Sequence, residues 1–177
     1  MAQTAKKLMM LNKKTKNKLD TFEQVYGYAM NLLNYRDYSS KDMLLKLKSK
    51  GAAEEDARKA VEKLLENRFI NEEHYAEQVY RAWLSKKTYG RQHLAMELYR
   101  KNVAEECVPE IMAAFTDELE LLNAVHATKE FVSRNKRKLQ NYDDKLVAAA
   151  GRFMMNRGFA TRYIQVLLEA IRAESNI

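Results

Sequence analysis

The sequence predicts an all-α protein of three tandem three-helix repeats that form an elongated, curved body. Two observations lead to this fold class. The chain has only one proline and five glycines, fewer chain breaks than a turn-rich β protein needs, while 46% of its 177 residues are hydrophobic and can fill a core. In addition, the phrase LKSKGAAEED at residues 47–56 returns 51 positions later as LYRKNVAEEC at residues 98–107.

The repetition extends to a third copy. With an offset of 51 and then of 56, apolar positions align, and the late ones are spaced i, i+3, i+4, i+7, which is one face of an α-helix. The aligned triples are Leu47, Leu98 and Met154; Ala57, Val108 and Ile164; Ala60, Ile111 and Leu167; Val61, Met112 and Leu168; and Leu64, Phe115 and Ile171. Gly51, Asn102 and Gly158 stand before these late helices and are residue types that close a preceding helix in the left-handed conformation. Each repeat therefore ends with a helix stop followed by a half-buried helix.

The first repeat is expected to span residues 21–70. Its apolar periodicity predicts a helix over residues 21–35. Ser39 and Asp42 have the spacing of a capping box at the start of the middle helix. The acids at residues 54–56 begin the third helix, because negative charge near a helix N-terminus interacts favourably with the helix dipole and the free N–H groups.

The second repeat is expected to span residues 71–115. Asn71, followed by two glutamates, caps its first helix, and Gly90 takes the capping position before the middle helix. Pro109 fits the first turn of the third helix, where a missing backbone N–H costs nothing.

The third repeat is expected to span residues 116–177, with Thr116 capping its first helix. Residues 1–20 form a basic tail with six lysines and one aspartate, and we expect it to be flexible because it has too little apolar surface to fold by itself. The tail is either a solubilising extension or an arm that contacts nucleic acid.

Charge is sorted along the body of the chain. Basic residues cluster without an intervening acid at residues 81–91 and 134–138, whereas residues 103–128 contain six acids and no Lys or Arg. A sorted surface favours oriented docking over indiscriminate binding. Trp83 and Tyr89 lie within the first basic cluster, where aromatic side chains can contact bases, although the helical pattern places Trp83 in the core.

No pattern in the sequence predicts an enzyme, a metal site or a cofactor site. The three histidines are too scattered to form a metal site, and the glycines are isolated, so they form no phosphate-binding loop. The clustered carboxylates recur at the same place in two copies and are interpreted as helix starts. The histidines are His74, His93 and His126.

The remaining composition is that of a cytoplasmic protein. Cys107 is the only cysteine and is interpreted as a core residue of a protein in a reducing compartment. No apolar stretch approaches the roughly 20 residues of a membrane span, and the N-terminal LMML is too short for a signal-peptide core. Four methionines at helical apolar positions are interpreted as core filler: Met96, Met112, Met154 and Met155.

This order of motifs resembles the RecX family, bacterial regulators of the RecA recombinase built from tandem three-helix repeats. The resemblance covers residues 22 to 172 and is clearest in YSSKDMLLKLKSKG at residues 38–51, which is similar to the family's Ser-x-x-Glu-Leu…Leu-x-x-Lys-Gly pattern. A second stretch, FINEEHYAEQVYRAWLSKKTYGRQHLAMELYRKNV, is similar to the family's aliphatic-Asp-Asp-x-x-Phe-Ala…Arg…Gly…Leu…Lys-Gly string. Its matching positions are Ile70, Asn71, Tyr75, Ala76, Arg81, Gly90, Leu98 and Lys101. Asp42, Asn71 and Asn102 depart from the family's residue types but keep their capping roles.

The resemblance implies a non-enzymatic regulator that binds the RecA–DNA filament along its groove and suppresses ATP hydrolysis and strand exchange. Such a protein modulates DNA repair, homologous recombination and the SOS response. We expect a monomer that binds single- or double-stranded DNA weakly when alone, contacts no membrane and needs no cofactor. The candidate contact residues for RecA or DNA are Arg81, Lys86, Lys87, Tyr89, Arg91, Lys50, Arg100, Lys101, Arg134, Lys136, Arg137, Lys138 and Arg157.

A second hypothesis is a direct DNA-binding protein, because three-helix units with a basic helix resemble helix-turn-helix modules. Residues 91–101 offer Arg91, Gln92, Arg100 and Lys101 for this role. The small net charge of the body argues against strong binding to free DNA. Binding to naked duplex across a salt series separates the two hypotheses, and a pure scaffold shows neither activity.

Overall fold

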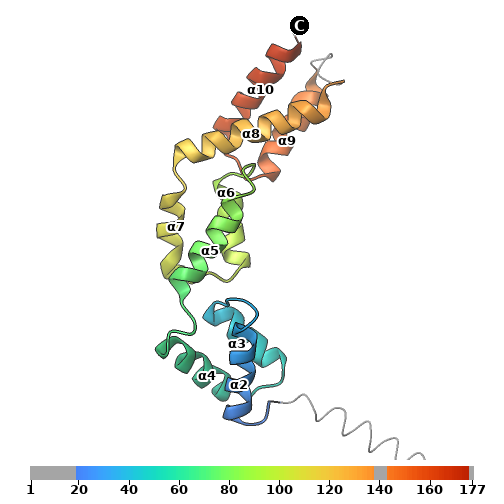
Figure 1. Cartoon of the computed structure of the whole chain (residues 1–177). Coiled ribbons are helices and arrows are strands. Elements are labelled where there is room, and N and C mark those ends of the chain that lie inside the picture. The colour runs from blue at the N-terminus through green and yellow to red at the C-terminus, as the bar shows by residue number, and fades with distance from the viewer. Residues whose placement is uncertain (1–18, 138–142, 176–177) are drawn as a thin grey trace, which may run out of the picture. The chain divides into compact units, whose positions relative to one another are not determined.

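The computed structural model describes residues 19–137 and 143–175, and its regular structure there is entirely helical (Figure 1). No strand occurs within these two ranges, so the all-α prediction is confirmed. The α-helices are α2 (Phe22–Leu33), α3 (Ser40–Ser49), α4 (Glu54–Glu66), α5 (Glu72–Leu84), α6 (Arg91–Arg100), α7 (Val108–Ala114), α8 (Asp117–Asn135), α9 (Asp144–Asn156) and α10 (Thr161–Ser175).

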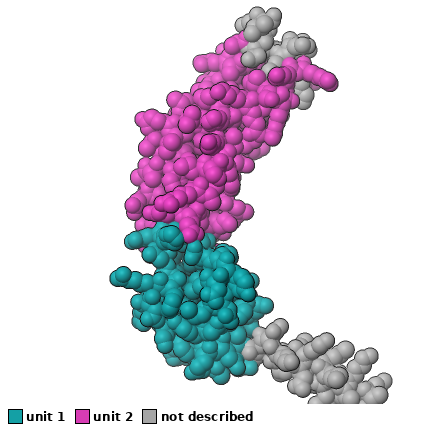
Figure 2. All heavy atoms as spheres, viewed as in Figure 1, with its two compact units in different colours: residues 1–75 teal, residues 76–177 magenta. Residues whose placement is uncertain are grey.

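The chain divides into two compact units, one within residues 1–75 and the other within residues 76–177 (Figure 2). In the first unit, α2, α3 and α4 pack around one apolar core. The apolar stripe predicted for α4 faces this core and is buried, which confirms the helical period read from the sequence. Its members are Ala57, Ala60, Val61 and Leu64.

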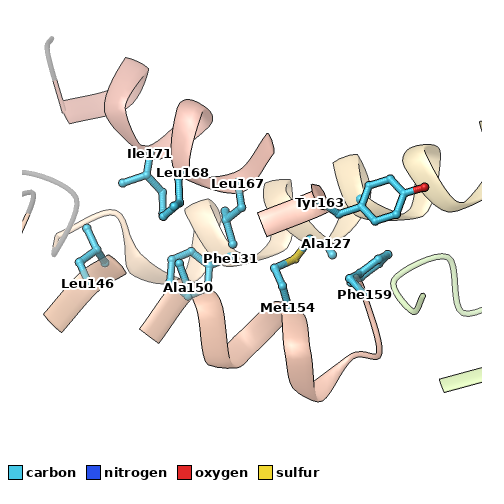
Figure 3. Packing of buried hydrophobic residues seen from close by; sticks show 11 residues of the cluster. Ala127, Phe131, Leu146, Ala150, Met154, Phe159, Tyr163, Leu167, Leu168 and Ile171 are labelled. Carbon is cyan, nitrogen blue, oxygen red and sulfur yellow. The ribbon is translucent and has the colours of Figure 1, made fainter. Parts of the chain in front are cut away.

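In the second unit, α8, α9 and α10 pack around another apolar core (Figure 3). Phe131 of α8 and Met154 of α9 meet the α10 side chains Leu167, Leu168 and Ile171 there. The three α10 residues are the third copies of the repeated apolar positions, and all three are buried. The same repeated stripe therefore supplies the core in both units.

The helix starts predicted from the sequence are confirmed. The side-chain oxygens of Ser39, Asn71 and Thr116 each accept a hydrogen bond from the backbone N–H three residues later, at 3.1, 2.8 and 3.4 Å. Gly90 is the N-cap of α6, and Pro109 lies in the first turn of α7. The three side-chain caps satisfy N–H groups that have no partner within their own helix.

The helix stops are also confirmed. Gly51, Asn102 and Gly158 all adopt the left-handed conformation, with φ angles of 89°, 51° and 77°. Two further residues adopt it without a sequence signal, Arg68 at 58° and Lys87 at 57°. Both lie just beyond a helix, where this conformation closes the last turn.

Carboxylates from a later helix cap the middle helices in both units. Glu72 Oε1 of α5 accepts a hydrogen bond from the backbone N–H of Ser40, the first residue of α3, at 2.7 Å. Glu120 Oε1 of α8 does the same for Arg91, the first residue of α6, at 2.8 Å. Ser40 and Arg91 are 51 positions apart and therefore equivalent in the repeat. The middle helices α3 and α6 thus each begin at a negative charge supplied by the second helix after them.

Two glycines bring backbone against backbone in the second unit. The N–H of Gly90 donates to the carbonyl of Arg157 at 2.9 Å, and the N–H of Gln92 donates to the carbonyl of Gly158 at 3.1 Å. A Cβ atom at Gly158 would overlap the backbone nitrogen of His93, so only glycine fits this approach. The start of α6 is therefore fastened to the turn between α9 and α10.

Candidate interaction surface

The basic cluster at residues 81–91 is only partly available to a partner. Arg81, Lys86 and Lys87 are exposed. Arg81 pairs with a surface acid of its own helix at 2.8 Å, and Lys86 Nζ lies 3.8 Å from Glu97. The exposed Arg81 pair contributes about 0–1 kcal/mol, so a partner can displace it at little cost, whereas the Glu97 carboxylate near Lys86 is buried.

Arg91 is engaged inside the second unit. Its guanidinium donates to the carbonyls of Met112 and Phe115 at the end of α7, at 2.9 and 2.6 Å. It also pairs with Asp117 at 3.2 Å and with Glu120 at 3.4 Å on α8. These contacts satisfy carbonyls at a helix C-terminus and neutralise a buried carboxylate. Arg91 therefore holds α6, α7 and α8 together.

Arg157 is likewise used internally. Its guanidinium donates to Glu130 at 2.8 Å and to the Thr88 hydroxyl at 3.2 Å. It also lies over the Phe153 ring at 4.3 Å and over the Tyr89 ring at 5.2 Å. The structure thus places Tyr89 and Arg157 together, half-buried, between α9 and the loop that precedes α6.

Trp83 is a core residue, as its helical position indicates. It is buried, packs edge-on against Phe115 and donates from Nε1 to His93 Nδ1 at 2.9 Å. The His93 ring also packs at a tilt against Tyr89, with ring centroids 4.0 Å apart. Burial and the nearby Lys86 ammonium lower the pKa of His93, because both disfavour the imidazolium form.

We expect the second unit to lose stability as the pH falls below about 6.5, the ordinary pKa of histidine. The unfolded chain binds a proton at His93 there, whereas the folded chain, with its lowered pKa, does not. Stability is therefore full above the unfolded pKa and declines toward the folded pKa. Urea denaturation at pH 7.5 and pH 5.5, followed by Trp83 fluorescence, checks this. His93→Gln keeps an acceptor for Trp83 and should reduce the difference between the two pH values; an equal difference in both proteins would contradict the assignment.

The candidate cations at helix ends lie where the dipole favours positive charge. Lys50 and Lys101 are the C-caps of α3 and α6, and Arg100 is the last residue of α6. Arg100 pairs with Glu97 at 2.7 Å. Burial raises the pKa of Glu97, but the Arg100 hydrogen bond and the charge of Lys86 outweigh it, so the net shift is downward.

The last basic group spans the C-terminal end of α8. Arg134 is exposed and pairs with Glu130 at 2.8 Å. Lys136 and Arg137 are also exposed, whereas Lys138 lies outside the described residues. The candidate cations therefore lie in separate groups along the chain. Two of these cations, Arg91 and Arg157, are bonded inside the second unit.

The interpretation of the methionines is wrong at two positions. Met154 is fully buried and Met112 half-buried, but Met96 is 69% exposed and Met155 63% exposed. Tyr99 is 82% exposed on the same helix as Met96. Sequence reasoning overlooked these residues because an outward apolar stripe has the same helical spacing as a buried one.

Neither a metal site nor a membrane span was found in the parts of the chain that the structure describes. No group of three or more His, Cys, Asp or Glu among those residues is placed to hold a metal ion. None of the helices there combines the length and apolar character needed to cross a bilayer. Cys107 is buried, in agreement with its interpretation as a core residue.

The fold and these surfaces define an all-helical protein of tandem three-helix repeats with separate groups of exposed basic side chains. Residues 26–64 match the family model described as RecX, first three-helix domain. The chain is similar to RecX regulatory proteins in this domain and along most of its length.

Curated relatives are similar to most of the chain, and a solved RecX structure shares its fold. The chain is 26% identical over 149 residues to the regulatory protein RecX of Chlorobium phaeobacteroides, a match that covers 84% of this chain and 94% of the relative. It is 27% identical over 159 residues to the RecX protein of Enterococcus faecalis, covering 90% of this chain but only 59% of that longer relative. The crystal structure of RecX from Lactobacillus salivarius superposes with a TM-score of 0.71 at 19% identity, covering 86% of this chain and 97% of that one.

Proposed function

We propose that this chain is a cytoplasmic, non-enzymatic regulator that binds the RecA–DNA filament along its groove and suppresses ATP hydrolysis and strand exchange. In this role it modulates DNA repair, recombination and the SOS response. The observation that carries the proposal is the similarity to RecX regulatory proteins, which spans 84% of this chain and 94% of the Chlorobium relative. The chain needs no cofactor for this role and acts as a monomer.

The repeat supplies a physical reason why a filament suits this chain. We propose the division into a tail at residues 1–20 and repeats at residues 21–70, 71–115 and 116–177. Contacts made by successive repeats to successive protomers add without each incurring the full entropy loss of a separate association. An elongated, curved arrangement of the repeats stays a prediction of this proposal.

The contacts that we propose come from the exposed basic residues and from the half-buried Tyr89. Arg91 and Arg157 act within the fold, so a substitution there would report on stability instead of binding. The proposed contact residues are Lys50, Arg81, Lys86, Lys87, Tyr89, Arg100, Lys101, Arg134, Lys136 and Arg137.

The double variant Arg81→Glu/Lys87→Glu is expected to weaken binding to the filament by roughly three- to tenfold. Each exposed charge at an interface is worth on the order of 1 kcal/mol or less, and both are reversed. Co-sedimentation with RecA filaments assembled on single-stranded DNA with a non-hydrolysable ATP analogue measures the effect. Lys129→Glu, an exposed cation of α8 outside the candidate set, is the matched control and should bind like the wild type.

The alternative function, direct binding to DNA, is tested with the same wild-type and variant proteins. The same proteins are titrated onto naked duplex from low to physiological salt. Weak binding that vanishes with salt agrees with the proposal, because non-specific binding depends on phosphate contacts alone. Tight, sequence-selective binding without RecA would replace the proposal with a direct DNA-binding role.

A further inference from the structure

His93 lies in the second unit where the start of α6 meets three neighbouring segments. Its Nδ1 accepts a hydrogen bond from the indole N–H of Trp83 on α5 at 2.9 Å, and its ring packs against Tyr89 in the loop before α6. Its backbone lies so close to Gly158, in the turn between α9 and α10, that a Cβ atom there would overlap it. His93 therefore has little room to leave Trp83 unless the first turn of α6 moves. We call these four residues the α6 joint.

The hydrogen bond from Trp83 determines which nitrogen of His93 carries the proton. An indole N–H only donates, so Nδ1 must offer its lone pair, and the neutral ring carries its proton on Nε2. A second proton on Nδ1 would direct two N–H groups at each other. Trp83 is only 2% exposed, so its N–H would then lack an acceptor in a place that water scarcely reaches. Protonation of His93 and its contact with Trp83 therefore exclude each other.

The charges around His93 favour the neutral ring. On its own helix, Glu97 lies one turn further along and is already bonded to Arg100 at 2.7 Å. Lys86, in the loop before α6, lies 3.8 Å from the same carboxylate. Burial is the main reason why the pKa of His93 is lowered, and Lys86 and Arg100 add to this effect while Glu97 partly opposes it. Glu97 is thus shared by two cations and offers little compensation to an imidazolium.

Through Tyr89 the α6 joint is also tied to α8 and α9. Asn123 of α8 donates to the Tyr89 carbonyl at 2.9 Å. The Arg157 guanidinium lies over the Tyr89 ring at 5.2 Å and pairs with Glu130 of α8 at 2.8 Å. These two charges compensate each other, so the pair adds little net charge toward His93. α8 and α9 therefore hold Tyr89 in place against the imidazole ring.

We propose that the α6 joint is sensitive to protons, and that protonation of His93 at Nδ1 releases the start of α6 from α5 and from the turn between α9 and α10. Release breaks the backbone hydrogen bonds from Gly90 to Arg157 and from Gln92 to Gly158, which fasten α6 to that turn. The α8–α10 core is a separate apolar cluster that does not include His93, so it remains packed when the joint opens. Opening begins as the pH falls below about 6.5, the ordinary pKa of histidine, because the open form then binds the proton more readily than the closed form.

This local opening is distinct from the loss of stability expected for the unit as a whole. Lys86 and Lys87 lie in the loop between Trp83 and Tyr89, so opening of the α6 joint also moves two of the proposed contact residues. That consequence alone rests on the proposed function, whereas the opening itself is measured without RecA.

Amide hydrogen exchange of the full-length chain, followed by NMR at pH 7.5 and pH 5.5, tests the inference. Protection is expressed relative to the unfolded-chain rate at each pH, which removes the pH dependence of exchange itself. The Gly90 and Gln92 amides of the wild type are expected to lose roughly five- to tenfold protection, because pH 5.5 lies about one unit below the ordinary pKa of histidine. They should also exchange faster than the Leu167 amide in the α10 core, which opens only with the unit. Equal protection of all three amides at pH 5.5 would overturn the inference.

Two variants separate His93 from the other titrating groups. His93→Gln keeps an acceptor for Trp83 but takes up no proton, so its Gly90 and Gln92 amides should have the same protection at both pH values. His126→Gln removes the half-buried histidine of α8 and should behave like the wild type. A loss of protection in His93→Gln as large as that in the wild type would assign the opening to another group and refute the inference.

A measurement on the wild type alone decides the question if His93→Gln does not fold. The ¹⁵N shifts of the His93 imidazole at pH 7.5 should show a proton on Nε2 and a lone pair on Nδ1, and the Trp83 indole N–H signal should titrate together with His93. The opposite tautomer, or a Trp83 signal that stays unchanged while His93 titrates, would rule out a proton-sensitive joint.

Discussion

Replacing Gly158 with alanine is expected to destabilise the second unit by about 2–5 kcal/mol, from left-handed strain of roughly 1–2 and overpacking of roughly 1–3. Gly158 has a φ angle of 77°, which residues with a Cβ atom rarely adopt. Its added Cβ would overlap the backbone nitrogen of His93, and neither backbone segment can move without breaking the hydrogen bond from Gln92 to the Gly158 carbonyl. Urea denaturation followed by the fluorescence of Trp83, the only tryptophan in the chain, measures the loss.

Gly151 provides the matched control. It lies inside α9 with no atom within 4 Å of the position of an added Cβ. Gly151→Ala is therefore expected to stabilise the unit by about 1 kcal/mol, the difference between the helix propensities of the two residues. Equal stability of Gly158→Ala and the wild type would mean that the close approach between α6 and the turn before α10 does not exist in solution.

Replacing Glu120 with alanine is expected to cost about 1–3 kcal/mol, the usual effect of leaving a partly buried N–H donor without its acceptor. The Glu120 side chain is only 2% exposed and accepts hydrogen bonds from the backbone N–H and the guanidinium of Arg91, at 2.8 and 3.4 Å. Arg162 of α10 lies 3.8 Å from the same carboxylate. Its removal leaves the first N–H of α6 without an acceptor and the Arg91 guanidinium without its nearest buried countercharge.

Thermal and urea denaturation measure this loss. Glu169→Ala, which removes an exposed acid of α10 in the same unit, is the control and should change stability by no more than about 0.5 kcal/mol. Glu120→Gln keeps an acceptor oxygen without the charge and should fall between the wild type and Glu120→Ala. A stability of Glu120→Ala equal to that of Glu169→Ala would show that the buried network does not hold α6 to α8.

Local features of the fold could be predicted because their signals lie within a few residues. Ser39, Asn71 and Thr116 bond to N–H groups three positions away, and Gly51 and Gly158 close the helix that precedes them. Both kinds of contact are set by backbone geometry within one turn. The repeat strengthened these predictions, because the same signal recurred at equivalent positions.

Contacts between distant residues could not be predicted in this way. Arg91 and Glu120 are 29 positions apart, and nothing in either local sequence distinguishes a buried carboxylate from the exposed acids that surround Glu120. Arg91 and Arg157 therefore looked like surface cations, although their guanidinium groups are bonded inside the unit. The repeat did contain one usable signal for these contacts. Ser40 and Arg91 are equivalent first residues of a helix, and the backbone N–H of each needs an acceptor.

The exposed methionines reveal a second limit. Helical spacing establishes that a set of apolar residues shares a face, but it does not say which of two apolar faces packs on the core. Leu94 and Leu98 of α6 are buried, whereas Met96 and Tyr99 on the other side are exposed. Burial of one face and exposure of the other follow from tertiary packing, which sequence periodicity does not encode.

The most direct test of the proposed function is the DNA-dependent ATPase activity of the cognate RecA measured while this protein is titrated in. A regulator that lies along the filament groove is expected to lower the ATPase rate in a dose-dependent manner, with Arg81→Glu/Lys87→Glu requiring a higher concentration for the same decrease. An ATPase rate that stays constant across a titration reaching a large molar excess over RecA would contradict the account.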